Sequence, residues 1–426
     1  MKNEKSQFFK VLKLRNFLLF VISQTVSQFG DKLDYIALIA IAGFFKEKAP
    51  LYLSYLAISF TAPVFLFGPV SGVLIDRWNK KKVLIICDLI RALLAFLIPT
   101  LFLATGKIHL IFILVFFMFL CTLFYNTTKM AIIPNLVEKE TILAANSAIS
   151  FVGRMATFSG MAVGGFIIDW PIWKKYLNIE GWRIAFYFDA LTFLISAIFI
   201  FLITTRLSIS LRANSTEKTI PNLFRISLKK ILTDLKQAFF YIYQNRRVTF
   251  AIASIFLLVI AASVIYVLAV PTIQQDLSMG TGGVGLLGAV GSIGLITGAL
   301  IFGITGHRFD LTKAILVSFI GIGVFVVTFP LIKLYWAIVI LAFFMGCLAQ
   351  PIIICQDTIL HRNISEEVRG RIFSVREWTL NVTFALAAIM IGMLSIAIPK
   401  NLLFFSFGTS IIVFSVYLWL RFMKAK

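Results

Sequence analysis

The stretch that decides the fold reads Gly72-Val-Leu-Ile-Asp-Arg-Trp-Asn-Lys-Lys-Lys82, and it joins two long apolar segments. Glycine lets two helices approach closely, Asp76 can accept hydrogen bonds from a helix end, and Arg77 presents a planar fork of donors. A basic run that includes Lys81 follows. The combination predicts a gate that locks the cytoplasmic side closed. The alternative is a positively charged turn with no gating role.

The composition around this stretch is that of a membrane protein. Of the 426 residues, 60% are hydrophobic and only 14% are charged, and the mean hydropathy is +0.95. Soluble domains are about 45–50% apolar and about 25% charged. A water-soluble enzyme is therefore excluded, and we expect no catalytic residues. The four cysteines lie in apolar stretches without a C-x-x-C pair, so we expect neither a disulfide framework nor a metal site.

Hydropathy predicts an all-α membrane protein, because a span needs about 20 apolar residues and the chain offers twelve such stretches. The expected spans are Phe17–Phe45, Leu51–Ile75, Val83–Thr105, Ile108–Thr128, Ile142–Ile168, Ile184–Thr205, Val248–Gln275, Leu277–Gly306, Ala314–Ile332, Leu334–Gln356, Ile372–Pro399 and Leu402–Leu420.

The distribution of Lys and Arg sets the expected orientation. With the N-terminus inside, 28 of the 40 basic residues fall in cytoplasmic segments and 8 in external ones. The positive-inside rule then places both termini in the cytoplasm and the chain in the cell membrane, inner or cytoplasmic, as a multi-pass protein. The net charge of +21 is explained by a basic surface against anionic lipid, so we expect membrane lipids as partners and no nucleic acid.

The longest polar interval divides the chain into two halves. We expect a six-helix bundle over residues 1–205, a cytoplasmic linker with an amphipathic helix over 206–247, and a second bundle over 248–426. Gly303 and Arg308 follow the eighth span at the same separation from each other as Gly72 and Arg77. This fits two parallel repeats, although coincidence between two glycine-containing basic turns is the alternative.

The motif at Gly72 resembles the signature G-x-L-x-D-R-x-G-R-[KR] between the second and third helices of the major facilitator superfamily, with Asn79 in place of the second glycine. This resemblance implies twelve helices in two pseudo-symmetric six-helix bundles. Shorter pieces are similar to the branch of macrolide and siderophore (enterobactin) exporters. They are Leu14–Phe17, Gly30–Leu33, Asp88–Ala92, Ala144–Ser147, Phe188–Phe193 and Val368–Ser374. A lysophospholipid-transporter branch shares the architecture and a charged first helix.

Charged residues inside the spans are the strongest site candidates. Asp31 and Asp34 are three residues apart near the middle of the first span, so they share a helix face, whereas Lys32 points elsewhere. Ionised groups at that depth cost at least about 2.5–3.5 kcal/mol each without a cavity or partner. Arg154 and Asp189 are the expected partners from other spans. One acid of this set stays unpaired, which predicts that it is protonated, binds a cation or is in contact with water; a static ion network is the alternative.

We predict that the Asp31–Asp34 pair is the coupling or cation-binding site, with Asp31 the preferred member and Asp189 the next candidate. Asp88 and Arg91 in the third span are expected to extend the gate, and Glu377 in the eleventh span to reach it. Four glycines of the eighth span lie on roughly one face and predict close helix packing. They are Gly288, Gly291, Gly294 and Gly298.

These features predict a secondary active transporter that exports a hydrophobic or amphiphilic small molecule against a proton gradient by alternating access. The glycine-rich run at Gly280–Gly285 lacks a G-K-[ST] ending, so ATP is not expected to drive transport and no cofactor is expected. We expect a monomer. The alternatives are a lysophospholipid transporter and a non-transporting membrane sensor with the same fold.

Overall fold

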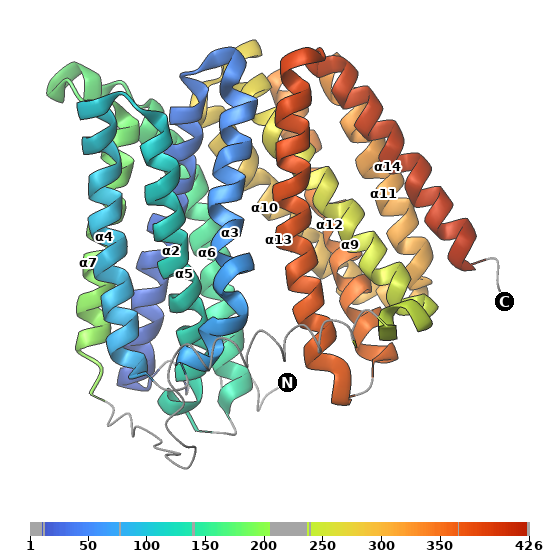
Figure 1. Ribbon diagram of the computed structural model, residues 1–426, viewed down its shortest axis with the longest axis horizontal. Helices are drawn as coiled ribbons and strands as arrows, with labels where there is room; N and C mark the ends of the chain where they lie inside the picture. The colour runs from blue at the N-terminus through green and yellow to red at the C-terminus, as the bar shows by residue number, and fades with distance from the viewer. Residues whose placement is uncertain are drawn as a thin grey trace. The chain divides into compact units, whose positions relative to one another are not determined.

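The computed structural model describes residues 11, 13–75, 78–138, 141–204, 237, 240–364 and 366–423. This part of the chain consists of helices and short connections and contains no strand, which confirms the expected all-α fold (Figure 1). The long helices are α2 (Arg15–Gly43), α3 (Ala49–Ile75), α4 (Lys80–Thr105), α5 (Ile108–Leu136), α6 (Ile142–Asp169), α7 (Gly181–Phe201), α9 (Arg246–Val264), α10 (Gly280–Thr305), α11 (Leu311–Thr328), α12 (Tyr335–Asn363), α13 (Glu366–Ala397) and α14 (Lys400–Met423).

Eleven helices of the described residues are long and apolar enough to cross a membrane, and α2 is not among them. Its 29 residues exceed the length that a span requires. Its four charged residues and its polar stripe lower its hydropathy, and α2 is also the helix that carries the acids of the first expected span. The hydropathy of α2 is therefore low because of the candidate site that it carries.

Local sequence signals explain several helix boundaries. The Asn79 side chain accepts a hydrogen bond from the backbone N–H of Lys82 at 3.1 Å and begins α4. Gly106 ends the same helix at φ +64°, where its N–H bonds to the carbonyl of Phe102 and a Cβ atom would be disfavoured. Asp310 caps α11 in the same way as Asn79 caps α4.

The chain divides into two compact units. Unit 1 consists of Met1–Leu38 and Ala62–Leu228, and unit 2 of Ile39–Thr61 and Lys229–Lys426. The last five residues of α2, after Leu38, and the first half of α3 are therefore assigned to unit 2. The predicted boundary at 206–247 and its amphipathic helix lie outside the described residues except for 237 and 240–247.

Helix α2 of unit 1 packs closely against α6. A Cβ atom at Gly160 would fall 2.7 Å from the carbonyl oxygen of Phe29, and one at Gly164 would fall 3.1 Å from Leu33. At Gly153, one would fall 2.6 Å from the Gln28 side chain. These glycines let α6 approach the charged helix at backbone distance. Helix α4 packs in turn against α5 and α7.

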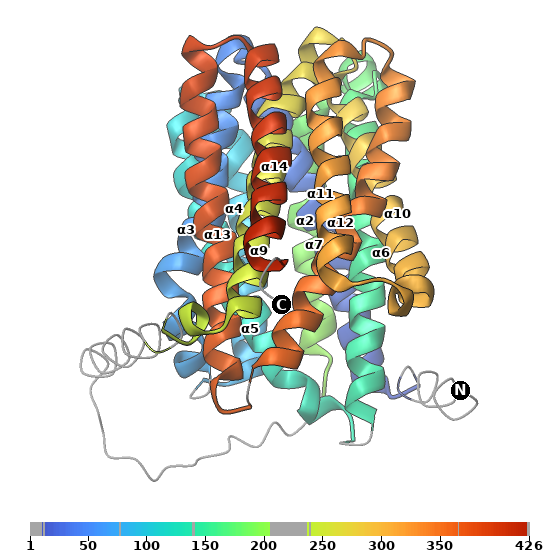
Figure 2. The ribbon, with the colours of Figure 1, turned by 90° about the vertical axis from the view of Figure 1, so that its right-hand side faces the viewer.

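Helices α10 and α12 of unit 2 are in similarly close contact (Figure 2). A Cβ atom at Gly298 would fall 2.7 Å from the carbonyl oxygen of Cys347, and one at Gly294 would overlap the backbone of Phe343. The expected close packing of this glycine face is confirmed at these positions. Gly323 and Gly408 make an equivalent contact between α11 and α14, where a Cβ atom at Gly323 would fall 3.0 Å from the Gly408 carbonyl oxygen.

Candidate functional site

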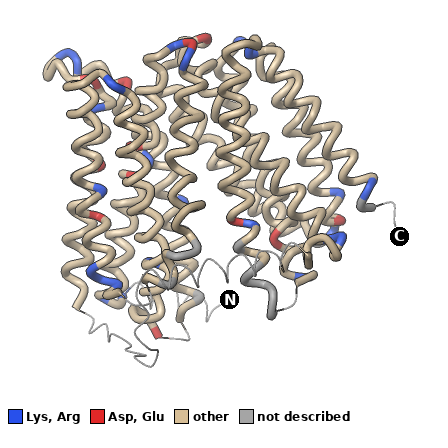
Figure 3. The backbone as a smooth tube through the Cα atoms, viewed as in Figure 1, with Lys and Arg blue, Asp and Glu red and all other residues tan. Residues whose placement is uncertain are grey.

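The charged residues of unit 1 identify the candidate site. Figure 3 shows most Lys, Arg, Asp and Glu near the ends of helices, with a few midway along helices of unit 1. By their positions in the sequence, the charged residues within these helices lie on α2, α4, α5, α6 and α7. Ionisable residues in membrane helices are rare and mark ion or substrate pathways.

Arg91 on α4 is the centre of this cluster. Its side chain is 1% exposed, and it makes an ion pair with Asp88 one turn earlier on the same helix. Its Nη1 lies 3.4 Å from Asp31 Oδ1 on α2, and its Nη2 donates to Ser27 Oγ at 3.4 Å. Three groups on two helices therefore accept hydrogen bonds from one guanidinium, which is the geometry that arginine's planar fork allows.

Two aromatic rings enclose the same guanidinium. The Arg91 Cζ atom lies 4.3 Å from the ring centroid of Tyr125 on α5 and 4.2 Å from that of Phe193 on α7. Cation–π contacts at such desolvated sites contribute up to about 2 kcal/mol each. Arg91 therefore connects four helices of unit 1 through contacts that a lysine could reproduce only in part.

A chain of hydroxyl groups extends the cluster toward the start of α2. Ser196 Oγ on α7 donates to Asp88 Oδ2 at 2.7 Å and lies 3.0 Å from Ser23 Oγ. Gln24 Nε2 donates to the Tyr125 hydroxyl at 2.5 Å. Buried polar groups are stabilised when such partners are complete. Asp88 is therefore satisfied on both carboxylate oxygens.

Unlike Asp88, the buried acids Asp34 on α2 and Asp189 on α7 have carboxyl oxygens without hydrogen-bond donors in the described structure. Asp34 is 2% exposed and Asp189 is fully buried, and their carboxyl groups lie close enough to act on each other electrostatically. Thr192 Oγ1 donates to Asp189 Oδ1 at 2.8 Å. Neither oxygen of Asp34, nor Oδ2 of Asp189, receives a hydrogen bond from a donor in the described part of the chain.

Gly30 lies where these two acids meet. Gly30 and Asp34 are four residues apart on α2 and share a helix face. A Cβ atom at Gly30 would overlap the Asp189 carboxylate and the Thr192 hydroxyl. The missing side chain therefore admits the end of Asp189 beside Asp34.

The cluster carries a surplus of acids over bases. Asp31, Asp34, Asp88 and Asp189 are four carboxyl groups, and Arg91 and Lys129 are the cations that interact with them. Lys129 lies on α5 and acts electrostatically on Asp31. With every carboxyl ionised, the group would carry two more negative than positive charges inside a helix bundle. Such an arrangement requires a proton, a bound cation or water.

Arg154, the basic residue expected to pair with the acids, does not lie among them, and Lys32 contacts other groups. Arg154 has an exposed side chain on α6, and no ion pair joins it to an acid among the described residues. Lys32 lies 6.0 Å from the ring centroid of Tyr35 and packs against Gly160. The structure does not show the expected pairing of these acids with Arg154 among the described residues; Arg91 from α4 pairs with Asp31 instead.

Asp88 and Arg91 were expected to extend the gate, and the structure places them in the acid cluster instead. The gate motif ends at the start of α4, whereas these residues lie two to three turns further along the helix and contact α2 and α7. Proximity in sequence to the motif suggested the gate, but the helix turns carry both side chains into the interior of unit 1.

The gate motif itself is only partly described. Asp76 and Arg77 lie outside the described residues. Gly72 and Gly303 have nothing within 4 Å of a Cβ position in the described structure. The close helix contact expected at Gly72 stays a prediction, because its neighbours Asp76 and Arg77 are not described. Lys81 Nζ donates to the carbonyl oxygens of Phe201 and Ile203 at 2.7 Å each and thus caps the end of α7.

The remaining residues of the predicted gate lie in unit 2. Arg308 is exposed in the turn that follows α10. Glu377 on α13 is also exposed and accepts a hydrogen bond from Arg376 Nη1 at 2.6 Å, while Arg376 Nη2 lies 3.0 Å from Asp357 Oδ1 on α12. The expected contact of Glu377 with Asp76 and Arg77 stays a prediction, because both of those residues lie outside the described part.

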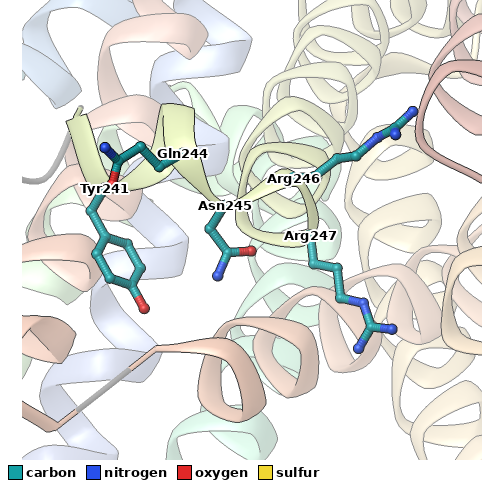
Figure 4. Close-up of a pocket in the computed structure, with 5 residues that line it drawn as sticks. All are labelled: Tyr241, Gln244, Asn245, Arg246 and Arg247. Atoms are coloured by element: carbon teal, nitrogen blue, oxygen red, sulfur yellow. The ribbon is translucent and has the colours of Figure 1, made fainter. Parts of the chain in front are cut away.

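A polar pocket of about 450 Å³ lies at the start of α9 in unit 2 (Figure 4). Asn245 caps the helix and, with the Tyr241 hydroxyl, donates to the carbonyl oxygen of Asn363. Arg246 and Arg247 are exposed. Because its charged groups are open to solvent, this pocket resembles a polar surface and lacks the buried acids of unit 1. Its lining residues are Tyr241, Gln244, Asn245, Arg246 and Arg247.

Sequence reasoning named Asp189 as a partner of the α2 acids but missed the other groups that neighbouring helices supply, Ser196, Phe193 and Tyr125. Asp189, Phe193 and Ser196 follow one another at helical spacing on α7, which was a signal for a single functional face. The polar stripe of α2 was recognised, and two of its members reach the cluster: Ser27 contacts Arg91, and Gln24 contacts Tyr125. Nothing in the spacing along α5 indicated that Tyr125 would cover Arg91.

The chain is similar in sequence to several bacterial transporters. The chain is 28% identical to the uncharacterized MFS-type transporter YfiS of Bacillus subtilis (strain 168) over 42% of this chain and only 40% of that protein. It is 25% identical to the putative bacilysin exporter BacE of the same organism over 79% of both chains. It is also 25% identical to the lysophospholipid transporter LplT of Photorhabdus laumondii over 95% of both chains.

A solved structure shares the fold. The crystal structure of a bacterial homologue of the iron transporter ferroportin in an inward-facing state superposes with a TM-score of 0.70 at 13% identity, covering 96% of this chain and 99% of that one. The sequence profile of the Major Facilitator Superfamily matches residues 20–267 and again residues 251–426, and these matches span nearly the whole chain. The protein is therefore a multi-pass membrane protein that belongs to the Major Facilitator Superfamily.

Proposed function

We propose that this transporter exports a hydrophobic or amphiphilic small molecule by alternating access and that protons moving inward drive the export. The observation that carries the proposal is the surplus of buried carboxyl groups in unit 1. A purely structural bundle has no need of four acids around one arginine, and each unpaired charge there is costly.

Proton coupling follows from the chemistry of that surplus. A proton that crosses a potential of about 100 mV supplies about 2.3 kcal/mol, which is enough to concentrate a neutral solute tens of times. To use this energy, a carboxyl group must bind the proton from one side and release it to the other. A buried acid with no donor for its oxygens meets the first requirement, because protonation removes its uncompensated charge.

Export of a small molecule is supported by one relative, BacE, whose name describes a putative bacilysin exporter. A second candidate function is lysophospholipid movement, which is favoured by the alignment with LplT over 95% of both chains. The macrolide and siderophore branch stays a prediction from short motifs. A sensor that has kept the fold without transporting is the candidate from another class.

Transport by the purified protein in lipid vesicles distinguishes these functions. We would impose an outward or inward pH gradient and measure the flux of labelled amphiphilic drugs, a siderophore and a lysophospholipid. Flux that follows the pH gradient for one of the first two classes supports export. Lysophospholipid flux alone supports the second candidate, and no counterflow for any compound in either direction supports the sensor.

The orientation belongs to the same proposal. The basic residues favour cytoplasmic termini and a cytoplasmic linker, with the cell membrane as the location. A cysteine introduced near either terminus should react with a membrane-impermeant reagent only after the cells are opened. Reaction in intact cells would reverse the assigned orientation and, with it, the direction of transport.

A further inference from the structure

We propose that Asp34 and Asp189 share a single proton and that this carboxyl pair is the proton-binding site of the transporter. The binding of the proton follows from the geometry of unit 1 alone, whereas its role as the coupling proton rests on the proposed function. The pair differs from the site expected from sequence, because it joins α2 to α7 and leaves Asp31 to Arg91.

The carboxyl pair has few hydrogen-bond donors around it. Four carboxyl oxygens meet in the pair, and one of them, Asp189 Oδ1, accepts from Thr192. The other three receive no hydrogen bond within the described structure, although all are buried. Two carboxylates in contact cannot satisfy each other, since both are only acceptors. One proton converts an acceptor into a donor and joins the two groups by an O–H···O hydrogen bond.

The charged side chains on the neighbouring helices do not neutralise the pair. From α2 comes the carboxylate of Asp31, and from α4 comes Arg91, whose charge is already balanced by Asp88 and Asp31. Lys129 on α5 acts on Asp31. On α6, Arg154 is exposed, and no ion pair connects it to the pair. Lys32 on α2 lies over the Tyr35 ring, and among the described residues no ion pair joins it to the pair. Within the described part of the chain the pair therefore has no cation of its own, and a proton is the smallest compensating charge.

Helices α2 and α7 approach each other closely at Gly30. The overlap that a side chain at Gly30 would make with Asp189 and Thr192 shows that α2 and α7 meet closely at this level. No side chain on the Gly30 face can separate the two acids. The close approach leaves the two groups in contact and favours a single shared proton over two hydrated carboxylates.

The chemistry of the proposed step is a simple protonation. Asp34 and Asp189 as two carboxylates take up one proton from water and become one carboxylic acid hydrogen-bonded to one carboxylate. The charge of the pair changes from two negative to one negative. Release is the reverse reaction, and it becomes favourable when a conformational change hydrates the pair or brings a cationic substrate beside it.

Proton uptake by the purified, detergent-solubilised protein tests the pair without any substrate. We would titrate the wild type, Asp34→Asn, Asp189→Asn and the double variant from mildly alkaline to mildly acidic pH and count bound protons. With a shared proton, each single variant binds one proton fewer than the wild type, because the amide of the introduced Asn donates to the remaining carboxylate and keeps it ionised. The double variant binds no fewer protons than the single ones. Asp276→Asn is the matched control, because that acid is half-exposed in unit 2 and pairs with Lys400.

Two other results would overturn the proposal. Additive losses, with two protons missing in the double variant, would mean two independently protonated acids. No loss in any variant would mean that both groups are ionised. If a variant does not fold, infrared spectroscopy of the wild type provides the test. We expect the carbonyl stretch of a buried carboxylic acid, shifted in D₂O. Absence of this band would contradict a protonated Asp34–Asp189 pair.

Failure of this inference and failure of the proposed function give different results. If the pair binds a shared proton but a pH gradient drives no transport, the proton site stands and its role in coupling is contradicted. Transport driven by a pH gradient with unchanged proton counts in all variants would keep the function and place the proton elsewhere.

Discussion

The guanidinium of Arg91 on α4 lies 3.4 Å from the carboxylate of Asp31 on α2, and the two residues are 60 positions apart in the chain. This pairing assigns different roles to acids that are neighbours in sequence. Asp31 has a cationic partner and a side chain that is 29% exposed, whereas Asp34 has neither. The partly exposed acid, Asp31, balances the arginine, and the buried acid, Asp34, is left beside Asp189.

Replacement of Arg91 should strongly destabilise unit 1. Arg91→Met removes the cation that Asp88 and Asp31 share, and breaking a buried pair in this way costs about 3–5 kcal/mol. We expect a correspondingly lower unfolding midpoint in detergent. Arg154→Met is the matched control, because its side chain is exposed, and its effect should stay within about 0.5 kcal/mol. Equal effects of the two changes would contradict the central role of Arg91.

A methyl group at Gly30 should be far more disruptive than one at Gly303. Gly30→Ala pushes a Cβ atom into Asp189 and Thr192, and overpacking of this kind costs about 1–3 kcal/mol. Gly303→Ala meets nothing within 4 Å and should be neutral or stabilising, since alanine favours helix by up to about 1 kcal/mol. Thermal unfolding of both variants measures the difference. A stable Gly30→Ala variant with unchanged proton uptake would argue against close contact of the acids.

The gate motif leads to a separate prediction about conformational change. Asp76→Asn should leave the protein folded and inserted, because Asp76 lies at the predicted membrane edge, but it should slow the exchange between inward- and outward-facing states. The accessibility of single cysteines from each side of the membrane reports the populations of the two states. Unchanged accessibility together with unchanged transport would reduce the motif to a positively charged turn.

The cap of α11 should make stability depend on pH. Partial burial alone would raise the pKa of Asp310, but hydrogen bonds from the Thr312 hydroxyl and from the N–H of Lys313 lower it below its ordinary value. A lowered pKa means that the stabilisation is complete above the unfolded value of about 4 and is lost as the pH falls through the folded value. Asp310→Ala should cost about 1 kcal/mol at neutral pH and almost nothing in acid. A cost independent of pH would show that Asp310 contributes no charge-dependent capping.

The fold was largely predictable because its signals are local. Apolar stretches of sufficient length predict spans, and the glycine face of α10 predicted its close packing on α12. The spans were delimited less well: α5 continues to Leu136, although its predicted span ended at Thr128. Hydropathy follows the part of a helix that lies in lipid, whereas a helix continues until its backbone is capped or broken.

The site was predictable only within single helices. The position of Asp31 and Asp34 inside a span marked α2 as functional, because ionisable residues at that depth are rare. Helical spacing indicates which residues share a face, but it contains no information about the neighbouring helix. For that reason, Asp88 and Arg91 were assigned to the nearby gate motif, and the contact of Asp34 with Asp189 could be seen only in three dimensions.

Accumulation of substrate against its gradient by Asp34→Asn and Asp189→Asn in lipid vesicles tests the central claim most directly. Each variant should lose accumulation driven by a pH gradient and retain part of the exchange at equal pH, because the substrate can still move while no proton is bound. Asp276→Asn should behave as the wild type does. Accumulation at the wild-type level by either of the first two variants would contradict the assignment of the coupling proton to this pair.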